Sequence, residues 1–209
     1  MTIKLASIVE GDGEVAALPV LLRRLNDWKT PGQWVQILPP ARVSRAKFLN
    51  RPEEFSRHVQ LAASKCGEQG WILILLDADD DCPADLGAQL ARQAQAVAPH
   101  RRVSVVLANR EYEAWFLAAA HSLAGHRGFS LKPGDVAALV DAESPRDAKG
   151  WMAQRIAGGG YRETTDQAAF SARMDLNEAF QASRSFRKLC TDWCAQVGRS
   201  SGLAQAEQP

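Results

Sequence analysis

The segment 71–81 combines a short apolar run with a cluster of carboxylates. Residues 71–76 are all apolar, and Asp77, Asp79, Asp80 and Asp81 follow them. The run is too short to cross a membrane, which needs about 20 residues. It suits a strand that is buried on both faces, as in a parallel sheet. Because ligands bind outside the carboxyl ends of such strands, the segment predicts an α/β fold with an acidic site at this strand end.

A strand–helix order repeats through the first half of the chain, which predicts a mostly parallel sheet. Strands are expected at residues 3–9, 34–38, 71–77 and 102–108, and helices after residue 14, at 52–65, at 83–98 and from about 111. Pro19 falls inside the first helix, where we expect a later start or a local kink. The predicted core is therefore a four-stranded, mostly parallel sheet flanked by helices.

The pattern changes after His121, and the 209 residues are enough for one α/β domain with an appendage. We expect an α/β core at 1–124 and a helical C-terminal extension packed on it at 125–197. Short helices are expected at 136–140, 146–156, 167–173, 177–182 and 186–197. The polar, small residues at 198–209 predict a disordered tail.

The charge is nearly balanced, with a formal net charge of +1. Any contact with nucleic acid must therefore come from a local patch. The N-terminal apolar run meets Glu10 too soon for a signal peptide, so we expect a cytoplasmic protein without membrane contact. The cysteines and histidines lack the spacing of a zinc site, which favours reduced thiols.

Carboxylates follow three of the expected strands. They are Glu10 and Glu14, then Asp77, Asp79 and Asp81, and then Glu111 and Glu113. In an extended chain alternate residues face one way, so Asp77, Asp79 and Asp81 are expected to share a face. Asp80 would point away and cap the helix that begins at Pro83. Clustered oxygens of this kind bind Mg²⁺ or Mn²⁺, and we expect one or two ions.

The individual acids admit different roles. Glu10 can bind the metal or act as a general base, and Gly11 lets the backbone approach a phosphate. Glu14 is a catalytic candidate, and its alternative is helix capping. Glu111 and Glu113 cannot share one helix face, so we take Glu111 as a metal ligand and Glu113 as a catalytic residue. Their alternative is interaction with the helix dipole.

Basic residues supply candidate phosphate contacts. They are Arg42, Arg45 and Lys47 in a loop after the second strand, and Arg162, Arg184 and Arg187 in the extension. The alternative for each is a solvated surface residue. Lys149 is the residue expected to stabilise negative charge in a transition state.

Two of these motifs resemble the Toprim domain of topoisomerases, primases and OLD-family nucleases. IVEGDGE (residues 8–14) is similar to its Glu-Gly element, and LLDADDD (75–81) to its DxDxD element. The further motifs RVSRAK (42–47), NREYEAW (109–115) and RSFRKL (184–189) resemble DUF4276, a family of small bacterial Toprim-like proteins of unknown function. This resemblance covers nearly all of the chain.

The resemblance implies a metal-dependent nuclease that hydrolyses phosphodiester bonds in DNA or RNA, with Asp77 and Asp79 as the foremost metal ligands and as catalytic residues. OLD-family nucleases are the nearest comparison, because the chain has no room for a gyrase-like tyrosine module. They imply a role in bacterial anti-phage defence or DNA maintenance. The chain contains no GxxxxGK[ST] motif, so any controlling ATPase would be a separate protein.

Two other functions stay open. The chain can be a non-catalytic binding or regulatory subunit of an ATPase complex. It can also be a phospho-acceptor receiver fold, although that fold normally uses a lone aspartate with a later lysine and does not carry the Glu10–Gly11 turn. The sequence does not distinguish DNA from RNA, nor does it specify the oligomeric state.

Overall fold

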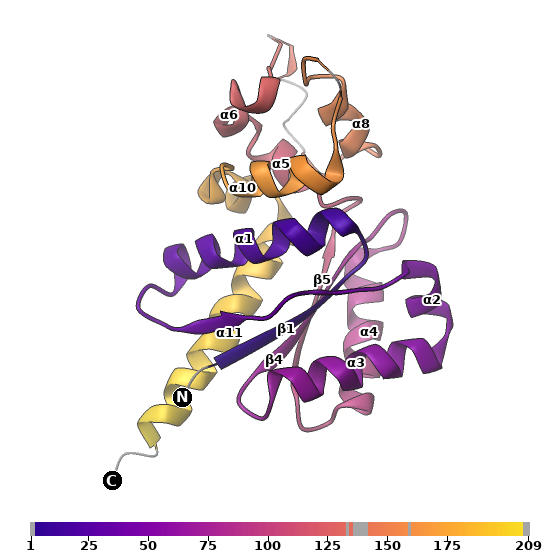
Figure 1. Cartoon of the computed structure of the whole chain (residues 1–209), viewed down its shortest axis with the longest axis vertical. Coiled ribbons are helices and arrows are strands. Elements are labelled where there is room, and N and C mark those ends of the chain that lie inside the picture. Colours follow the sequence, from indigo (N-terminus) through magenta and orange to yellow (C-terminus); the bar gives the residue numbers. More distant parts are fainter. Residues whose placement is uncertain (1–2, 133, 136–141, 159, 207–209) are drawn as a thin grey trace.

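The computed structural model describes residues 3–132, 134–135, 142–158 and 160–206. A parallel β-sheet lies at its centre (Figure 1). The strands are β1 (Ile3–Val9), β2 (Val35–Ile37), β3 (Ala41–Arg42), β4 (Trp71–Asp77) and β5 (Arg102–Ala108). Their order is β2-β1-β4-β5, with β3 also paired to β1, and every pair is parallel. The α/β class and the parallel sheet are thus confirmed.

The sheet has five strands rather than the four predicted. β2 pairs with the beginning of β1 and β3 with its end, where Val9 lies opposite Arg42. Pro39 and Pro40 separate the two short strands. Proline has no N–H to donate to a ladder, so one extended segment is divided in two. A strand of two residues has no periodicity from which it could be predicted.

Strand β4 is buried on both faces, as its apolar run predicted. Its side chains alternate between two hydrophobic cores. Trp71, Leu73 and Leu75 belong to one core, and Ile72, Ile74 and Leu76 to the other. The strand is therefore central, and its carboxyl end lies between neighbours that also end in acids.

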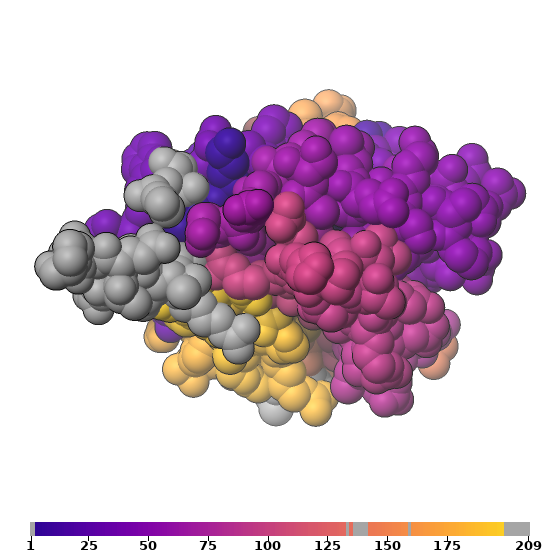
Figure 2. All heavy atoms as spheres, turned by 90° about the horizontal axis from the view of Figure 1, so that it is seen from below, coloured from indigo at the N-terminus to yellow at the C-terminus, as the bar shows by residue number. Residues whose placement is uncertain are grey.

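Helices cover the two faces. α1 (Asp12–Lys29) and α11 (Arg184–Ala206) share the first core, and α2 (Arg45–Asn50), α3 (Pro52–Cys66) and α4 (Pro83–Val97) contribute to the second. Seen from below, the yellow α11 lies on the opposite side from the purple segments of the first half (Figure 2). α1 continues through Pro19. Its buried leucines on either side, Leu18 and Leu21 among them, outweigh the hydrogen bond that the proline removes.

The elements between β5 and α11 form a helical group at one end of the molecule, above α1 in Figure 1. Its elements are α5 (Ala114–Ala118), α6 (Ala120–Leu123), η1 (His126–Gly128), α8 (Ala148–Ala153), η3 (Glu163–Gln167), α9 (Ala168–Ser171) and α10 (Leu176–Ala182). The expected helices at 146–156 and 167–173 are shorter than predicted, and the one expected at 136–140 lies outside the described residues. Phe129, Met152 and Phe170 of this group belong to the same core as α1 and the sheet.

Residues 198–206, which we expected to belong to a tail, are part of α11, which extends to Ala206. Phe186, Leu189, Trp193 and Val197 anchor this helix in the core. A helix that is nucleated by packing propagates cheaply into neighbouring residues. Within the described residues no helix has the length and apolarity needed to cross a membrane. The four cysteines are free thiols, as expected.

Candidate functional site

Carboxylates from three strand ends meet at one edge of the sheet. Glu10 follows β1, Asp77 ends β4, and Glu113 comes shortly after β5. β1 pairs with β4 and β4 with β5, so the three strand ends are neighbours. Glu14, in the first turns of α1, joins them: the negative charges of Glu10, Glu113 and Glu14 all act on Asp77. We call Glu10, Glu14, Asp77 and Glu113 the carboxylate site.

Asp77 is the last residue of strand β4. Burial, together with the negative charges of Glu10, Glu113 and Glu14, raises its pKa well above the usual range. The backbone N–H of Tyr112 donates to Asp77 Oδ1 over 2.8 Å and opposes this effect. The ionised form of Asp77 therefore lacks the positive charge that it needs, although its side chain is held firmly in place.

Glu10 is perturbed in the same direction. Burial and the charges of Glu14 and Asp79 raise its pKa to about 7, and Arg45 partly offsets them. The Oε2 atom of Glu10 is buried and accepts no hydrogen bond. A carboxyl group with a pKa near neutrality exchanges protons readily at physiological pH.

Gln167, the last residue of η3, forms hydrogen bonds with two of the acids. Its Nε2 donates to Glu113 Oε1 over 2.9 Å and to Glu14 Oε1 over 3.5 Å. Burial raises the pKa of Glu113, while the hydrogen bond from Gln167 and the charge of Lys149 lower it. Glu14 Oε2 and Gln167 Oε1 remain buried without a partner. Gln167 was not predicted, because a single glutamine in a short helix carries no sequence signal.

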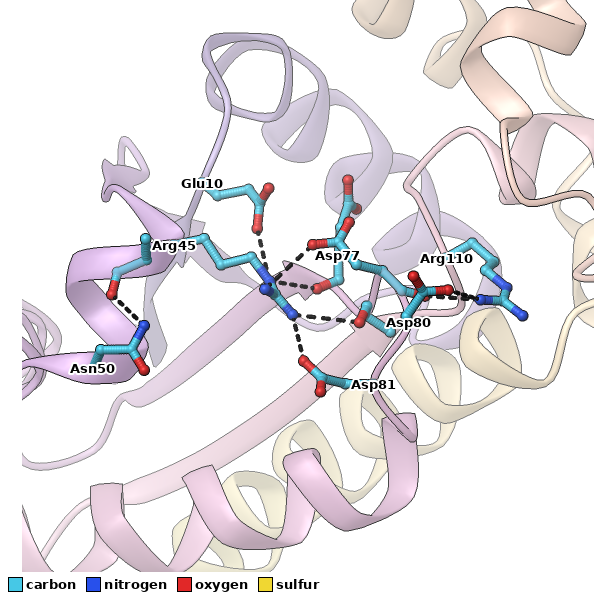
Figure 3. A network of polar contacts seen from close by, with 10 residues as sticks. Glu10, Arg45, Asn50, Asp77, Asp80, Asp81 and Arg110 are labelled. Carbon is cyan, nitrogen blue, oxygen red and sulfur yellow. Dashed lines mark hydrogen bonds and ion pairs between the residues drawn. The ribbon is translucent and has the colours of Figure 1, made fainter.

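Arg45 holds a position among the acids, as Figure 3 shows. Its guanidinium lies 2.8 Å from Asp81 Oδ2, 3.2 Å from Asp79 Oδ2 and 3.8 Å from Glu10 Oε2. It also donates to the backbone carbonyl of Asp77. We predicted Arg45 as a phosphate contact. In this structure it is a counter-ion of the acids, which the sequence did not reveal.

The aspartates after β4 do not continue the alternation of the strand. Asp79 has a φ of 50°, so the chain turns and Asp79 and Asp81 come to Arg45 from an exposed loop. Asp80 pairs instead with Arg110 over 2.7 Å (Figure 3). It does not cap α4, whose N-cap is Cys82 without a side-chain cap. The predicted capping role of Asp80 is wrong because the turn at Asp79 redirects it.

Glu111 and Lys149 connect the strand end to the extension. Glu111 Oε2 accepts the backbone N–H of Lys149 over 2.9 Å, so in this structure Glu111 fixes α8. The ammonium of Lys149 lies 2.5 Å from Glu163 Oε1. Although burial lowers the pKa of Lys149, its hydrogen bond to Glu163 and the charges of Glu113 and Glu111 raise it overall. Glu111 and Glu113 point to different partners, as their spacing predicted.

Glycine at position 11 permits the close packing of Glu14. A Cβ atom on Gly11 would lie 2.2 Å from Glu14 Oε2, so any larger residue would displace this carboxylate. Gly13 is equally close to Gln167, where a Cβ would lie 2.2 Å from Oε1. The two glycines thus let the acids and Gln167 approach one another. This is a different use from the predicted contact of backbone with phosphate.

The predicted basic residues occupy three places. Arg42 pairs with Asp12 over 3.1 Å beside the carboxylate site. Arg184 lies 3.5 Å from Glu143, and Arg187 donates to the carbonyls of α10, so these two support the α10–α11 junction. The side chain of Arg162 is exposed, and its backbone N–H donates to Asp166. Lys47 lines a cavity that is described below.

The family model "Domain of unknown function (DUF4276)" matches residues 9–192. The chain belongs to the DUF4276 family. The matched region includes the carboxylate site, Arg45, Lys149 and Gln167. No curated protein and no solved structure matched the chain.

The donor set of this DUF4276 chain is chemically suited to a hard divalent cation. All its candidate ligands are carboxylate oxygens, and Glu10 Oε2 and Glu14 Oε2 are buried without a hydrogen-bond partner. Among the described residues, no three acids, histidines or cysteines are arranged to enclose an ion in this conformation. Arg45 supplies positive charge next to Glu10, so binding an ion would require the acids and Arg45 to rearrange.

Proposed function

We propose that the chain is a Mg²⁺- or Mn²⁺-dependent nuclease with a Toprim-like core that hydrolyses phosphodiester bonds in DNA or RNA. The observation that supports this most is the convergence of Glu10, Asp77 and Glu113 from three adjacent strand ends, two of them with strongly raised pKa values. Buried acids whose charges repel one another are a costly arrangement. Such perturbed groups are typical of functional sites.

Glu10 and Asp77 are the residues that would hold the cation, with Asp79 and Asp81 close by and Glu14 behind them. When bound, one or two such ions activate water and stabilise charge on a phosphodiester. Without an ion the pKa of Glu10 lies near 7, so binding a cation there would favour the ionised carboxylate and release a proton. Asp77, held by the N–H of Tyr112, keeps a fixed orientation.

The extension contributes a cation, Lys149, which is paired with Glu163. Lys149 stays protonated because its pKa is raised, and the charge of Glu113 acts on it. An ammonium near the reacting phosphate stabilises the negative charge that develops in hydrolysis. The hydroxyl of Tyr161 is also held in its neutral form, because burial and the charge of Glu113 raise its pKa. It can therefore donate a hydrogen bond.

The test is cleavage of labelled single- and double-stranded DNA and RNA in Mg²⁺ or Mn²⁺. We expect Glu10→Gln and Asp77→Asn to lose at least 10²-fold in rate. Asp80→Asn is the matched control, because Asp80 faces Arg110 and Arg146 rather than the carboxylate site. Equal cleavage by the wild type, Glu10→Gln and Asp77→Asn would show that the carboxylate site is not the site of cleavage.

A second function, that of a non-catalytic subunit of a separate ATPase, is favoured by Arg45. Its guanidinium already lies within 3.8 Å of carboxylate oxygens of Glu10, Asp79 and Asp81 and partly offsets their charge, an arrangement that suits a site without an ion. Affinity purification of the tagged chain from its native host tests this function. Recovery of an ATPase, together with a purified chain that neither cleaves nucleic acid nor binds Mn²⁺, would favour the subunit.

A further inference from the structure

A cavity of about 210 Å³ lies beside the carboxylate site, between the segment 42–48 and helix α3. We call it the basic pocket. Its lining residues are Arg42, Val43, Ser44, Lys47, Phe48, Glu54, Arg57 and His58. Three of these side chains are cationic and one is a carboxylate, so the lining has an excess of positive charge within a chain whose net charge is only +1.

The pocket has a rigid apolar floor. Phe48 is buried, and its ring packs against Phe55 with the centroids 4.7 Å apart. The cations stand on the rim: Arg57 is held 2.7 Å from Glu54, and Arg42 is held 3.1 Å from Asp12. The buried Phe48 and the backbone of α2 and α3 give the lining an ordered part, while the two guanidinium groups are exposed at the surface. That ordered part needs little reorganisation to bind an anion.

Lys47 is the cation of the lining without a direct ion pair, although its charge acts on the carboxylate of Glu54. Its ammonium makes no hydrogen bond or ion pair with any residue that the structure describes, while the two arginines of the lining are each paired. A lysine kept unpaired over a concave basic surface is available to an anion. Ser44 adds a hydroxyl donor to the same cavity. Cationic and hydroxyl donors together are typical of phosphate recognition.

The pocket and the carboxylate site share one short segment. Arg42 lies opposite Val9, the residue before Glu10. Three residues later, Arg45 reaches the carboxylates (Figure 3). The Cα atoms of Arg42 and Arg45 can be at most about 11 Å apart. The pocket and the carboxylate site thus take residues from one short segment of the chain.

We propose that the basic pocket binds a phosphate group of the same nucleic-acid strand whose neighbouring phosphodiester lies at the carboxylate site. This inference rests on the proposed nuclease function. The phosphate can be an internal phosphodiester or a terminal monoester. In both cases the pocket sets the position of the strand relative to Glu10 and Asp77.

Binding of fluorescent 12-nucleotide strands in EDTA tests the pocket without any cleavage. Lys47→Ala and Arg57→Ala should each weaken binding by about 3- to 10-fold at low salt, and should reduce the slope of log affinity against log salt by about 0.7–1. Arg92→Ala is the matched control, because it removes an exposed arginine on α4 away from the pocket. Its affinity should stay within about twofold of the wild type.

Strands with and without a 5′-phosphate distinguish the two sources of the group. If the pocket takes a terminal monoester, removal of that phosphate weakens the wild type but not Lys47→Ala. If it takes an internal phosphodiester, both strands bind the wild type alike and Lys47→Ala weakens both. Thermal unfolding of each variant shows that it is folded.

The pocket assignment is overturned if Lys47→Ala and Arg57→Ala bind like Arg92→Ala, or if the wild type binds neither strand. Cleavage in Mg²⁺ is measured separately. Pocket-dependent binding without cleavage would overturn the nuclease function alone. Cleavage with pocket-independent binding would overturn the pocket alone.

Discussion

Replacing Glu10 by glutamine should make the protein more stable at alkaline pH, although it removes a proposed catalytic group. Burial, Glu14 and Asp79 raise the pKa of Glu10 from 4.5 to about 7. Between these pH values the native state binds more protons than the unfolded state. The free energy of unfolding therefore falls as the pH rises through this window.

The magnitude follows from the shift of about 2.5 pKa units. At 1.36 kcal/mol per unit this equals about 3.4 kcal/mol in full. The side chain of Glu10 is 23% exposed, and solvent screening reduces this value. We therefore expect Glu10→Gln to gain about 1–3 kcal/mol over the wild type at pH 8. The difference should shrink as the pH falls from 7 toward 4, because Glu10 becomes protonated in the unfolded state as well as in the native state.

Urea unfolding followed by tryptophan fluorescence, in EDTA at pH 5, 6, 7 and 8, measures this difference. Glu68→Gln is the matched control, because Glu68 is exposed in the turn between α3 and β4. That variant should follow the wild type at every pH. A Glu10→Gln protein that is no more stable than the wild type at pH 8, or whose stability difference does not vary with pH, would refute the reasoning.

Three further predictions concern other contacts. Arg45→Gln should bind Mn²⁺ about 3- to 30-fold more tightly than the wild type in calorimetry, because it removes a positive charge beside the acids. Arg110→Gln is the control and should bind Mn²⁺ like the wild type, and equal affinities for the two variants would contradict the prediction. Gln167→Leu should lower the free energy of unfolding by about 1–3 kcal/mol, because two buried acids lose a hydrogen-bond donor. Gln93→Leu, at an exposed site, is the control, and equal stabilities of the two variants would contradict the prediction. Burial raises the pKa of Glu143, but hydrogen bonds from two serine hydroxyls lower it overall. The ionised Glu143 therefore stabilises the native state above pH 4.5, and this contribution is lost as the pH falls through the lowered pKa. Glu143→Gln should therefore be less stable than the wild type at pH 7 by about 1–3 kcal/mol, and urea titrations that show the same gap at pH 3 would refute this.

The extent of sequence-based prediction differs between the strands and the loops that follow them. The run at 71–76 predicted β4 correctly because a continuous apolar segment fits a doubly covered strand. The alternation of Asp77, Asp79 and Asp81 was extrapolated from that strand and failed at Asp79, where φ is positive. Aspartate tolerates this conformation better than most residues, but nothing nearby in the sequence required it.

The extension shows the same limit. The helix at 186–197 was predicted from its apolar spacing, whereas its continuation to Ala206 was not. Packing of Trp193 and Val197 decided that continuation, and local polarity gave no indication of it. The partners of Lys149 likewise come from two segments, Glu111 from the end of β5 and Glu163 from η3.

By itself, the sequence determined the strand–helix order around β1, β2, β4 and β5 and placed acids after β1, β4 and β5. Both are local properties, which depend on the periodicity of apolar residues and on the residues that follow each run. Only the tertiary structure decided which side chains meet those acids. Gln167 reaches Glu14 across 153 residues and Glu113 across 54, and Arg45 reaches Asp81 across 36. Such contacts depend on how separate elements pack, and no local pattern specifies them.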